Sequence, residues 1–114
     1  MIATQSELVI DDEAREMMTG TLRIFAYEAI DAMNCVSEKC GIPLSKILVY
    51  VRQYPDLPGH RFLKLIACFD ADSSYSRLLW DTFTGALDSW IATKSAEDID
   101  FISDNLSTTF RWEN

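Results

Sequence analysis

Apolar side chains recur every three or four residues along the first third of the chain. The positions that form this stripe are Met18, Leu22, Phe25, Ala29, Met33, Val36 and Cys40. The spacing matches one face of an α-helix, which turns once every 3.6 residues. Asp11 or Asp12 can cap the beginning of this helix, and Gly41 followed by Pro43 ends it. The pattern therefore predicts a single long helix over residues 12–40.

A different pattern occupies residues 46–69. Residues 47–51 are rich in β-branched and aromatic side chains, and residues 61–69 alternate between two faces, one of them apolar. Residues 54–60 between them hold two prolines and a glycine, which is typical of a loop. The region therefore predicts an antiparallel β-hairpin. Two short helices are the alternative, because the apolar residues of 61–69 also fit a helical period.

Helical spacing returns after residue 70. A helix is predicted from Asp72 or Ser73 to about Lys94, where the stripe includes leucine, isoleucine and phenylalanine. The large aromatic residues on its stripes are Trp80, Phe83 and Trp90. They are predicted to lie in the core.

The C-terminal region predicts two more elements. Ser95 begins a capping motif for a short helix, and residues 108–112 alternate as a strand does. The apolar face of the short helix consists of Ile99, Ile102 and Leu106. The resulting order, α-β-β-α-α-β, predicts an α+β fold with helices against one face of a small antiparallel sheet. An all-α bundle is the alternative.

Composition indicates one globular domain over residues 1–114, because 48% of the residues are hydrophobic and 25% are charged. No apolar run approaches the roughly 18 residues that a membrane span needs. The first seven residues lack the basic-then-apolar order of a signal peptide. We therefore expect a cytoplasmic protein whose three cysteines are free thiols.

The charge is strongly negative and unevenly distributed. Ten basic and eighteen acidic residues give a net charge of −8. Residues 41–69 hold four basic residues and one acidic residue, whereas residues 70–114 hold three basic and nine acidic ones. The net charge opposes nucleic acids and anionic membranes, so we expect neither as a partner. It favours a basic protein partner.

One segment carries candidate chemistry. An apolar strand containing Cys68 ends in Asp70 and Asp72, and this arrangement suggests an enzyme or ligand-binding site, formed at a dimer interface. The alternative role of these aspartates is to end the strand and cap the next helix. No glycine-rich phosphate loop and no C-x-x-C pair occur, and His60 is the single histidine. We therefore assign no catalytic residue, no cofactor site and no metal site.

The length of the first predicted helix suggests a homodimer. Its 29 residues would span about 43 Å, whereas a domain of this size is only about 34 Å across. Either the helix bends or breaks at residues 19–21, where Gly20 is a weak helix former, or two copies pack together. We expect two copies to pack through residues 12–40, with Ile24, Tyr27 and Ile30 providing a second apolar face.

The leading hypothesis is a small acidic protein-binding module without enzymatic activity. Such a module would cover a basic surface of its target, as an inhibitor or an immunity-type protein does. The predicted contact residues, on the outer side of the short helix, are Glu97, Asp98, Asp100 and Asp104. Whether the basic hairpin residues Arg52, Arg61 and Lys64 form a contact surface is left open by the sequence.

Overall fold

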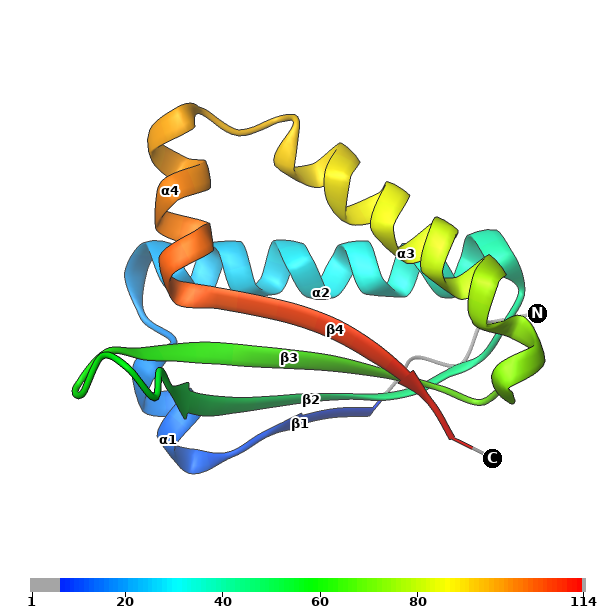
Figure 1. Cartoon of the computed structure of the whole chain (residues 1–114), viewed down its shortest axis with the longest axis horizontal. Helices are drawn as coiled ribbons and strands as arrows, with labels where there is room; N and C mark the ends of the chain where they lie inside the picture. Colours follow the sequence, from blue (N-terminus) through cyan, green and yellow to red (C-terminus); the bar gives the residue numbers. More distant parts are fainter. Residues whose placement is uncertain (1–6, 114) are drawn as a thin grey trace.

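Four strands form one sheet, and two long helices lie across one of its faces (Figure 1). This computed structural model describes residues 7–113. The expectation that the first seven residues are not a signal peptide therefore concerns a segment that lies almost wholly outside the described residues. The elements in chain order are β1 (Glu7–Ile10), α1 (Asp12–Met17), α2 (Gly20–Cys40), β2 (Leu44–Gln53), β3 (Arg61–Phe69), a 3₁₀ turn (Ser73–Tyr75), α3 (Ser76–Ile91), α4 (Ala96–Asn105) and β4 (Leu106–Trp112). The predicted α+β fold is confirmed, and the all-α alternative is wrong.

The sheet is mixed, with the strand order β1-β2-β3-β4. β2 and β3 form the predicted antiparallel hairpin, whereas β1 pairs with β2 and β4 pairs with β3 in parallel. Parallel neighbours need a long crossover connection, and the helices supply it. The chain therefore consists of two βαβ units joined by a hairpin, and the expectation of a wholly antiparallel sheet is wrong.

The core lies between the sheet and the helices. Side chains alternate along the central strands, so one face of each strand packs against α2 and α3. The most deeply buried strand residues on this face are Ile47, Val49, Leu63, Leu65, Ala67 and Phe69. From the helices, Phe25, Met33 and Leu79 join the same cluster, as the helical stripes predict. Within residues 7–113, no helix combines the length and the hydrophobicity needed to cross a bilayer.

The predicted single helix over residues 12–40 is interrupted. α1 ends at Met17, Thr19 is extended, and α2 begins at Gly20, whose φ of 55° is left-handed. Glycine tolerates this conformation, which costs other residues energy. The chain therefore turns at the point where the sequence has its weakest helix former.

This interruption removes the basis for the expected homodimer. Ala14 and Met18 are buried in the same core as α2, so both helices pack within the chain. With 21 residues, α2 spans about 32 Å, which fits within the longest dimension of 41 Å. Of the residues expected at the dimer face, Ile30 is buried, whereas Ile24 and Tyr27 are exposed.

A partly buried polar contact joins α2 to the C-terminal end of α3. The Glu28 carboxylate accepts a hydrogen bond of 2.8 Å from the Trp90 indole N–H and forms an ion pair with Lys94. The hydrogen bond from Lys94 is the largest cause that lowers the pKa of Glu28, and the bond from Trp90 adds to it. The ionised form of Glu28 therefore stabilises the packing of the two helices.

We expect Glu28→Gln to reduce the free energy of unfolding by about 1 kcal/mol at pH 7. The lowered pKa means that this contribution is complete above the ordinary pKa of 4.5 and disappears as the pH falls through the lowered value. Urea denaturation at pH 7 and pH 2.5 checks this. Glu38→Gln is the control, because Glu38 is an exposed carboxylate on the same helix. A loss that persists at pH 2.5 would contradict the assignment.

Candidate functional site

Of the exposed aromatic residues within residues 7–113, Tyr75, Trp80 and Trp112 lie in or beside α3 and β4, and Tyr27 lies on α2. Trp80 is 62% exposed, the largest value among the large hydrophobic residues described, and Trp112 is 39% exposed. Tyr75 and Leu78 at the start of α3 are also exposed. Exposed tryptophans that lie close together are typical of interaction surfaces, because burial in a partner releases water from large apolar areas.

The local structure explains why these rings point outward. Leu79 and Phe83 face the core, and Trp80 lies about 100° further around the helix, on the side towards β4. On β4, Phe110 and Trp112 project from the helix-covered face of the sheet, because their partners Ala67 and Phe69 do so. The prediction that Trp80 lies in the core is therefore wrong.

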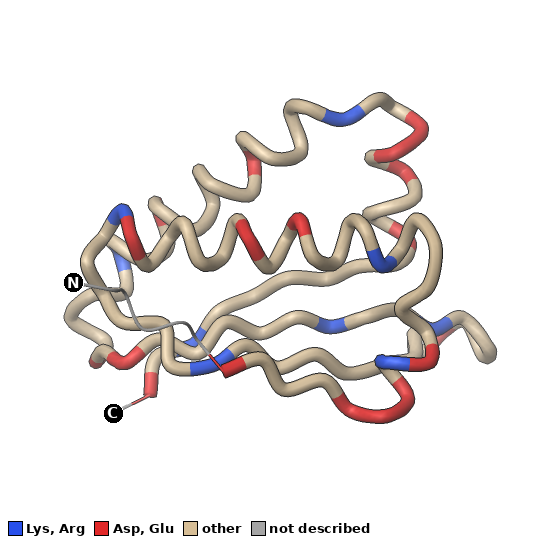
Figure 2. Tube along the Cα trace, turned by 180° about the vertical axis from the view of Figure 1, so that it is seen from behind, with Lys and Arg blue, Asp and Glu red and all other residues tan. Residues whose placement is uncertain are grey.

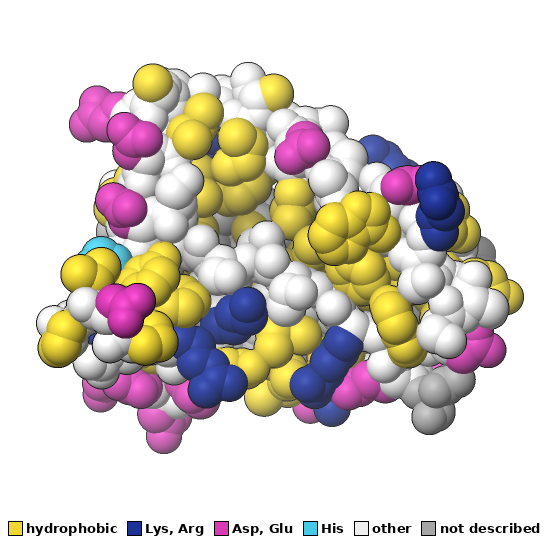
Figure 3. All heavy atoms as spheres, viewed as in Figure 1, with side chains coloured by type: hydrophobic (Ala, Val, Ile, Leu, Met, Phe, Trp, Pro, Cys, Tyr) yellow, Lys and Arg dark blue, Asp and Glu magenta, His cyan; other side chains and the backbone are white. Residues whose placement is uncertain are grey.

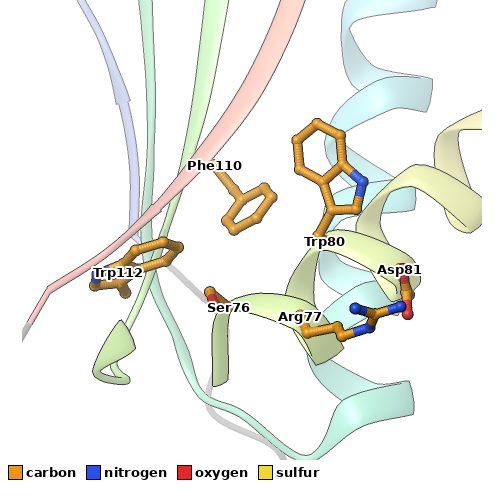
Figure 4. Close-up of a pocket in the computed structure, with 6 residues that line it drawn as sticks. All are labelled: Ser76, Arg77, Trp80, Asp81, Phe110 and Trp112. Atoms are coloured by element: carbon orange, nitrogen blue, oxygen red, sulfur yellow. The ribbon is translucent and has the colours of Figure 1, made fainter. Parts of the chain in front are cut away.

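Phe110 stands at the centre of an aromatic cluster. Its ring centroid lies 5.0 Å from that of Phe83, 6.3 Å from that of Trp80 and 6.1 Å from that of Trp112. Figure 4 shows the Trp80 and Trp112 rings on either side of Phe110, with Ser76 at the start of α3. The two exposed tryptophans therefore lie on a helix and a strand rather than on loops, and the ring contacts hold them in place.

Two adjoining hollows lie along the junction of α3 and β4. The first, of about 490 Å³, is lined by Ser76, Arg77, Trp80, Asp81, Phe110 and Trp112. The second, of about 410 Å³, shares Trp80 and Phe110 and extends along α3. Its further lining includes Phe83, Leu87, Asp88, Ile91 and Thr108. Together these residues form what we call the α3–β4 groove.

Acidic residues border the groove on the helix side. Asp81 and Asp88 come from α3, and α4 carries the residues predicted as partner contacts. Of these, Glu97, Asp100 and Asp104 are exposed and Asp98 is half-buried. Figure 3 shows acidic side chains over α3 and α4, and the trace in Figure 2 shows acidic residues along α2 as well. Acidity is therefore not confined to α4.

α4 is anchored only in part as the sequence predicts: of the expected apolar face, Ile99 is half-buried, and Leu106 is the first residue of β4 rather than part of the helix. Ser95 Oγ accepts a hydrogen bond of 3.1 Å from the Asp98 backbone N–H and caps the helix. Ile102 is buried, and Phe101 packs edge-on against Phe25 with ring centroids 5.9 Å apart. At the other end, His60 Nε2 lies 3.0 Å from the backbone oxygen of Asp104, so the hairpin loop contacts α4.

Basic residues gather on the face of the sheet that the helices do not cover (Figure 3). The alternation of β2, β3 and β4 places Lys46, Arg52, Lys64 and Arg111 there. Lys64 Nζ lies 3.3 Å from Ser107 Oγ, and the Arg52 guanidinium lies 4.5 Å from the Tyr50 ring centroid. Arg61 differs, since its guanidinium forms a 2.9 Å ion pair with Glu13 of α1.

The residues of the candidate enzyme site have different surroundings. Cys68 is fully buried in β3, whereas Asp70 and Asp72 are exposed in the turn that follows. Asp72 caps the 3₁₀ turn, and hydrogen bonds from the hydroxyl and then the backbone N–H of Ser74 lower its pKa. Asp72 thus has the capping role that the sequence offered as the alternative. Within the described part of the chain, no three His, Cys, Asp or Glu side chains form a group suited to a metal ion.

Comparison with protein-family models, curated proteins and solved structures finds no match for this chain. Among the described residues, the α3–β4 groove and its charged borders are the features that suggest a binding surface.

Proposed function

We propose that this chain is a protein-binding module that engages a basic partner through the α3–β4 groove and the carboxylates beside it. The observation that carries the proposal is the 62% exposure of Trp80, which packs against Phe110 beside an open hollow, with Trp112 on the other side of the Phe110 ring. Aromatic residues that fill a partner's pocket commonly dominate the energy of protein interfaces.

The distribution of charge supports the choice of partner. Interfaces typically have an apolar centre with a polar rim, and here the rim on the helix side carries Asp81 and Asp88 together with one basic residue, Arg77. Asp81 and Asp88 border the groove itself, and Glu97, Asp100 and Asp104 extend the acidic surface along α4. A basic partner would therefore be drawn to this surface and oriented on it before the aromatic residues are buried.

An inhibitor or immunity-type role fits this mode of binding. Such proteins act by covering a functional surface of their target, so exposed anchors on a rigid scaffold are sufficient. A cytoplasmic location is part of this proposal, and the free thiols Cys35, Cys40 and Cys68 support it, because thiols stay reduced in that compartment.

Reversing two charges on α4 tests the electrostatic part of the proposal. The partner for this experiment is a basic protein isolated by affinity capture with the wild-type chain. With Asp100 and Asp104 both changed to Lys, we expect association with this partner to slow by roughly tenfold at about 50 mM salt and much less at about 500 mM. The measurement is the association rate by surface plasmon resonance at both salt concentrations, after the melting temperature has been shown to be unchanged.

The matched control reverses Asp31 and Glu38, two exposed acids on α2. It changes the net charge by the same amount on a different side of the molecule, so it separates a local contact from a general effect of charge. Equal slowing by both double variants, or association that ignores ionic strength, would show that the α4 acids serve solubility alone.

A further inference from the structure

The outer edge of β4 has free hydrogen-bonding groups. The Glu113 N–H donates to the Phe69 carbonyl at 2.7 Å, and successive residues of a strand point these groups to opposite sides. Ser107, Thr109 and Arg111 therefore face β3. Thr108, Phe110 and Trp112 point outward, and within residues 7–113 no backbone hydrogen bond to their outward groups occurs.

This edge lacks most of the features that normally prevent strand pairing, although Arg111 gives it one charged side chain. Proteins protect edges with short strands, lysine, proline or bulges. The opposite edge, β1, has only four residues, whereas β4 has seven and contains no lysine, proline or glycine. The unprotected edge also runs along the α3–β4 groove, because Thr108 and Phe110 belong to both.

The two sides of this edge differ in chemistry. On the helix side, side chains of an added strand would enter the groove, whose lining includes Phe83, Leu87 and Phe110. On the open side of the sheet, they would lie beside Ser107 and Arg111, which are four residues apart. Lys64 extends to Ser107, so the first position offers a positive charge. At the second position the Arg111 guanidinium already forms a 3.2 Å ion pair with Glu113, and a carboxylate of the added strand would share it.

We propose that the partner contributes an extended segment that adds to β4 as a fifth strand. This inference rests on the proposed function and names the structure that enters the groove. Because side chains of a strand alternate, the segment has apolar residues at every second position, directed into the groove. Between them it has carboxylates four residues apart, placed against Lys64 and Arg111, while the acids of α4 contact basic residues of the partner outside this segment.

A defined peptide tests the alternation. The probe is acetyl-Glu-Leu-Thr-Leu-Glu-Leu-Thr-amide, and the control is the shuffled acetyl-Glu-Glu-Leu-Leu-Leu-Thr-Thr-amide. We expect the full-length chain to bind the probe at least roughly tenfold more tightly than the control, measured by tryptophan fluorescence titration. Equal binding of the two peptides, or binding of neither, would overturn the proposal.

A proline substitution tests the backbone contact. Thr108→Pro removes an outward N–H and leaves the bonds to β3, whereas Thr108→Ala changes the side chain and keeps the N–H. We expect Thr108→Pro to weaken probe binding by roughly tenfold or more and Thr108→Ala by no more than about twofold. Equal effects of the two variants would overturn strand addition.

Hydrogen exchange of the unmodified chain gives a second test, which holds even if the proline variant does not fold. Binding of the probe should slow exchange of the Thr108 and Phe110 amides, whereas that of Thr109, already bonded within the sheet, should change little. Unchanged exchange at Thr108 and Phe110 under saturating probe would contradict the proposal.

Two other outcomes identify what is wrong. If neither peptide binds while Trp80→Ala still abolishes partner binding, strand addition fails and the proposed function stands. If light scattering shows a dimer of the wild-type chain that Thr108→Pro alone converts to a monomer, the edge is occupied by a second copy, and the proposal of a partner segment is wrong.

Discussion

Replacing Phe25 by alanine is expected to reduce the free energy of unfolding by about 3–5 kcal/mol. Phe25 is 6% exposed and lies in the core between the helices and the sheet. Its ring packs against Phe101 of α4, and Lys94 Nζ lies 5.1 Å from the ring centroid. The substitution therefore creates a cavity where α2 meets α4. Because domains of this size are stable by about 5–15 kcal/mol, the loss would be a large part of the total.

Ile24 provides the matched control for this experiment. It precedes Phe25 on α2 but is 59% exposed, so Ile24→Ala should change stability by no more than about 0.5 kcal/mol. Chemical denaturation of both variants and of the wild type gives the comparison. A loss of less than about 1 kcal/mol for Phe25→Ala would show that the packing at this junction is different.

Replacing Trp80 by alanine is expected to weaken partner binding by roughly 30-fold or more, the effect of removing an interface hot spot of at least about 2 kcal/mol. The free chain should keep its stability to within about 0.5 kcal/mol, because most of the Trp80 ring is exposed. Isothermal titration calorimetry with the purified partner measures the first effect, and chemical denaturation measures the second.

Ile24→Ala again serves as the control, since Ile24 is exposed to a similar degree but lies on α2. It should bind the partner as the wild type does. Equal affinity of the wild type and Trp80→Ala would remove the groove from the interface. Equal weakening by Trp80→Ala and Ile24→Ala would indicate a general effect of lost hydrophobic surface.

Most of the fold follows from local sequence patterns. The apolar stripe through Phe25 and the alternation of residues 61–69 correctly predict which face of α2 and which face of β3 is buried in the core. β1 was missed, because four residues, Glu7–Ile10, carry too little pattern and their pairing partner lies about 40 residues away. The break at Thr19 depends on how α1 packs, although Gly20 marks the position where a helix is weakest.

Less of the candidate site than of the fold could be predicted from the sequence. Both Leu79 and Trp80 lie near apolar stripes of α3, but adjacent helical residues point about 100° apart, so they cannot share one narrow face. That angle was a usable signal that Trp80 faces outward. The place of β4 at the sheet edge, beside α3, depends on long-range parallel pairing with β3, which no local pattern encodes.

The basic residues of the hairpin illustrate the same limit. Strand alternation separates Arg61, which shares the face of Leu63, from Lys64 on the opposite face, and this division was available from the sequence. The position of Arg111 beside Cys68 could not be predicted from the sequence, because Arg111 lies on a strand more than 40 residues later. The charged surface along β4 therefore emerges only from the tertiary structure.

The three tryptophans of the chain allow the most direct test of the proposed groove. The Trp90 indole N–H is bonded to Glu28 and serves as an internal reference, whereas Trp80 and Trp112 line the groove. The measurement is a ¹H–¹⁵N spectrum of the indole signals, assigned with single Trp→Phe variants, before and after saturation with the partner. We expect the Trp80 and Trp112 signals to shift and that of Trp90 to stay in place. If the Trp80 and Trp112 signals do not shift when the chain is saturated with the partner, the proposal that the groove is the binding site is contradicted.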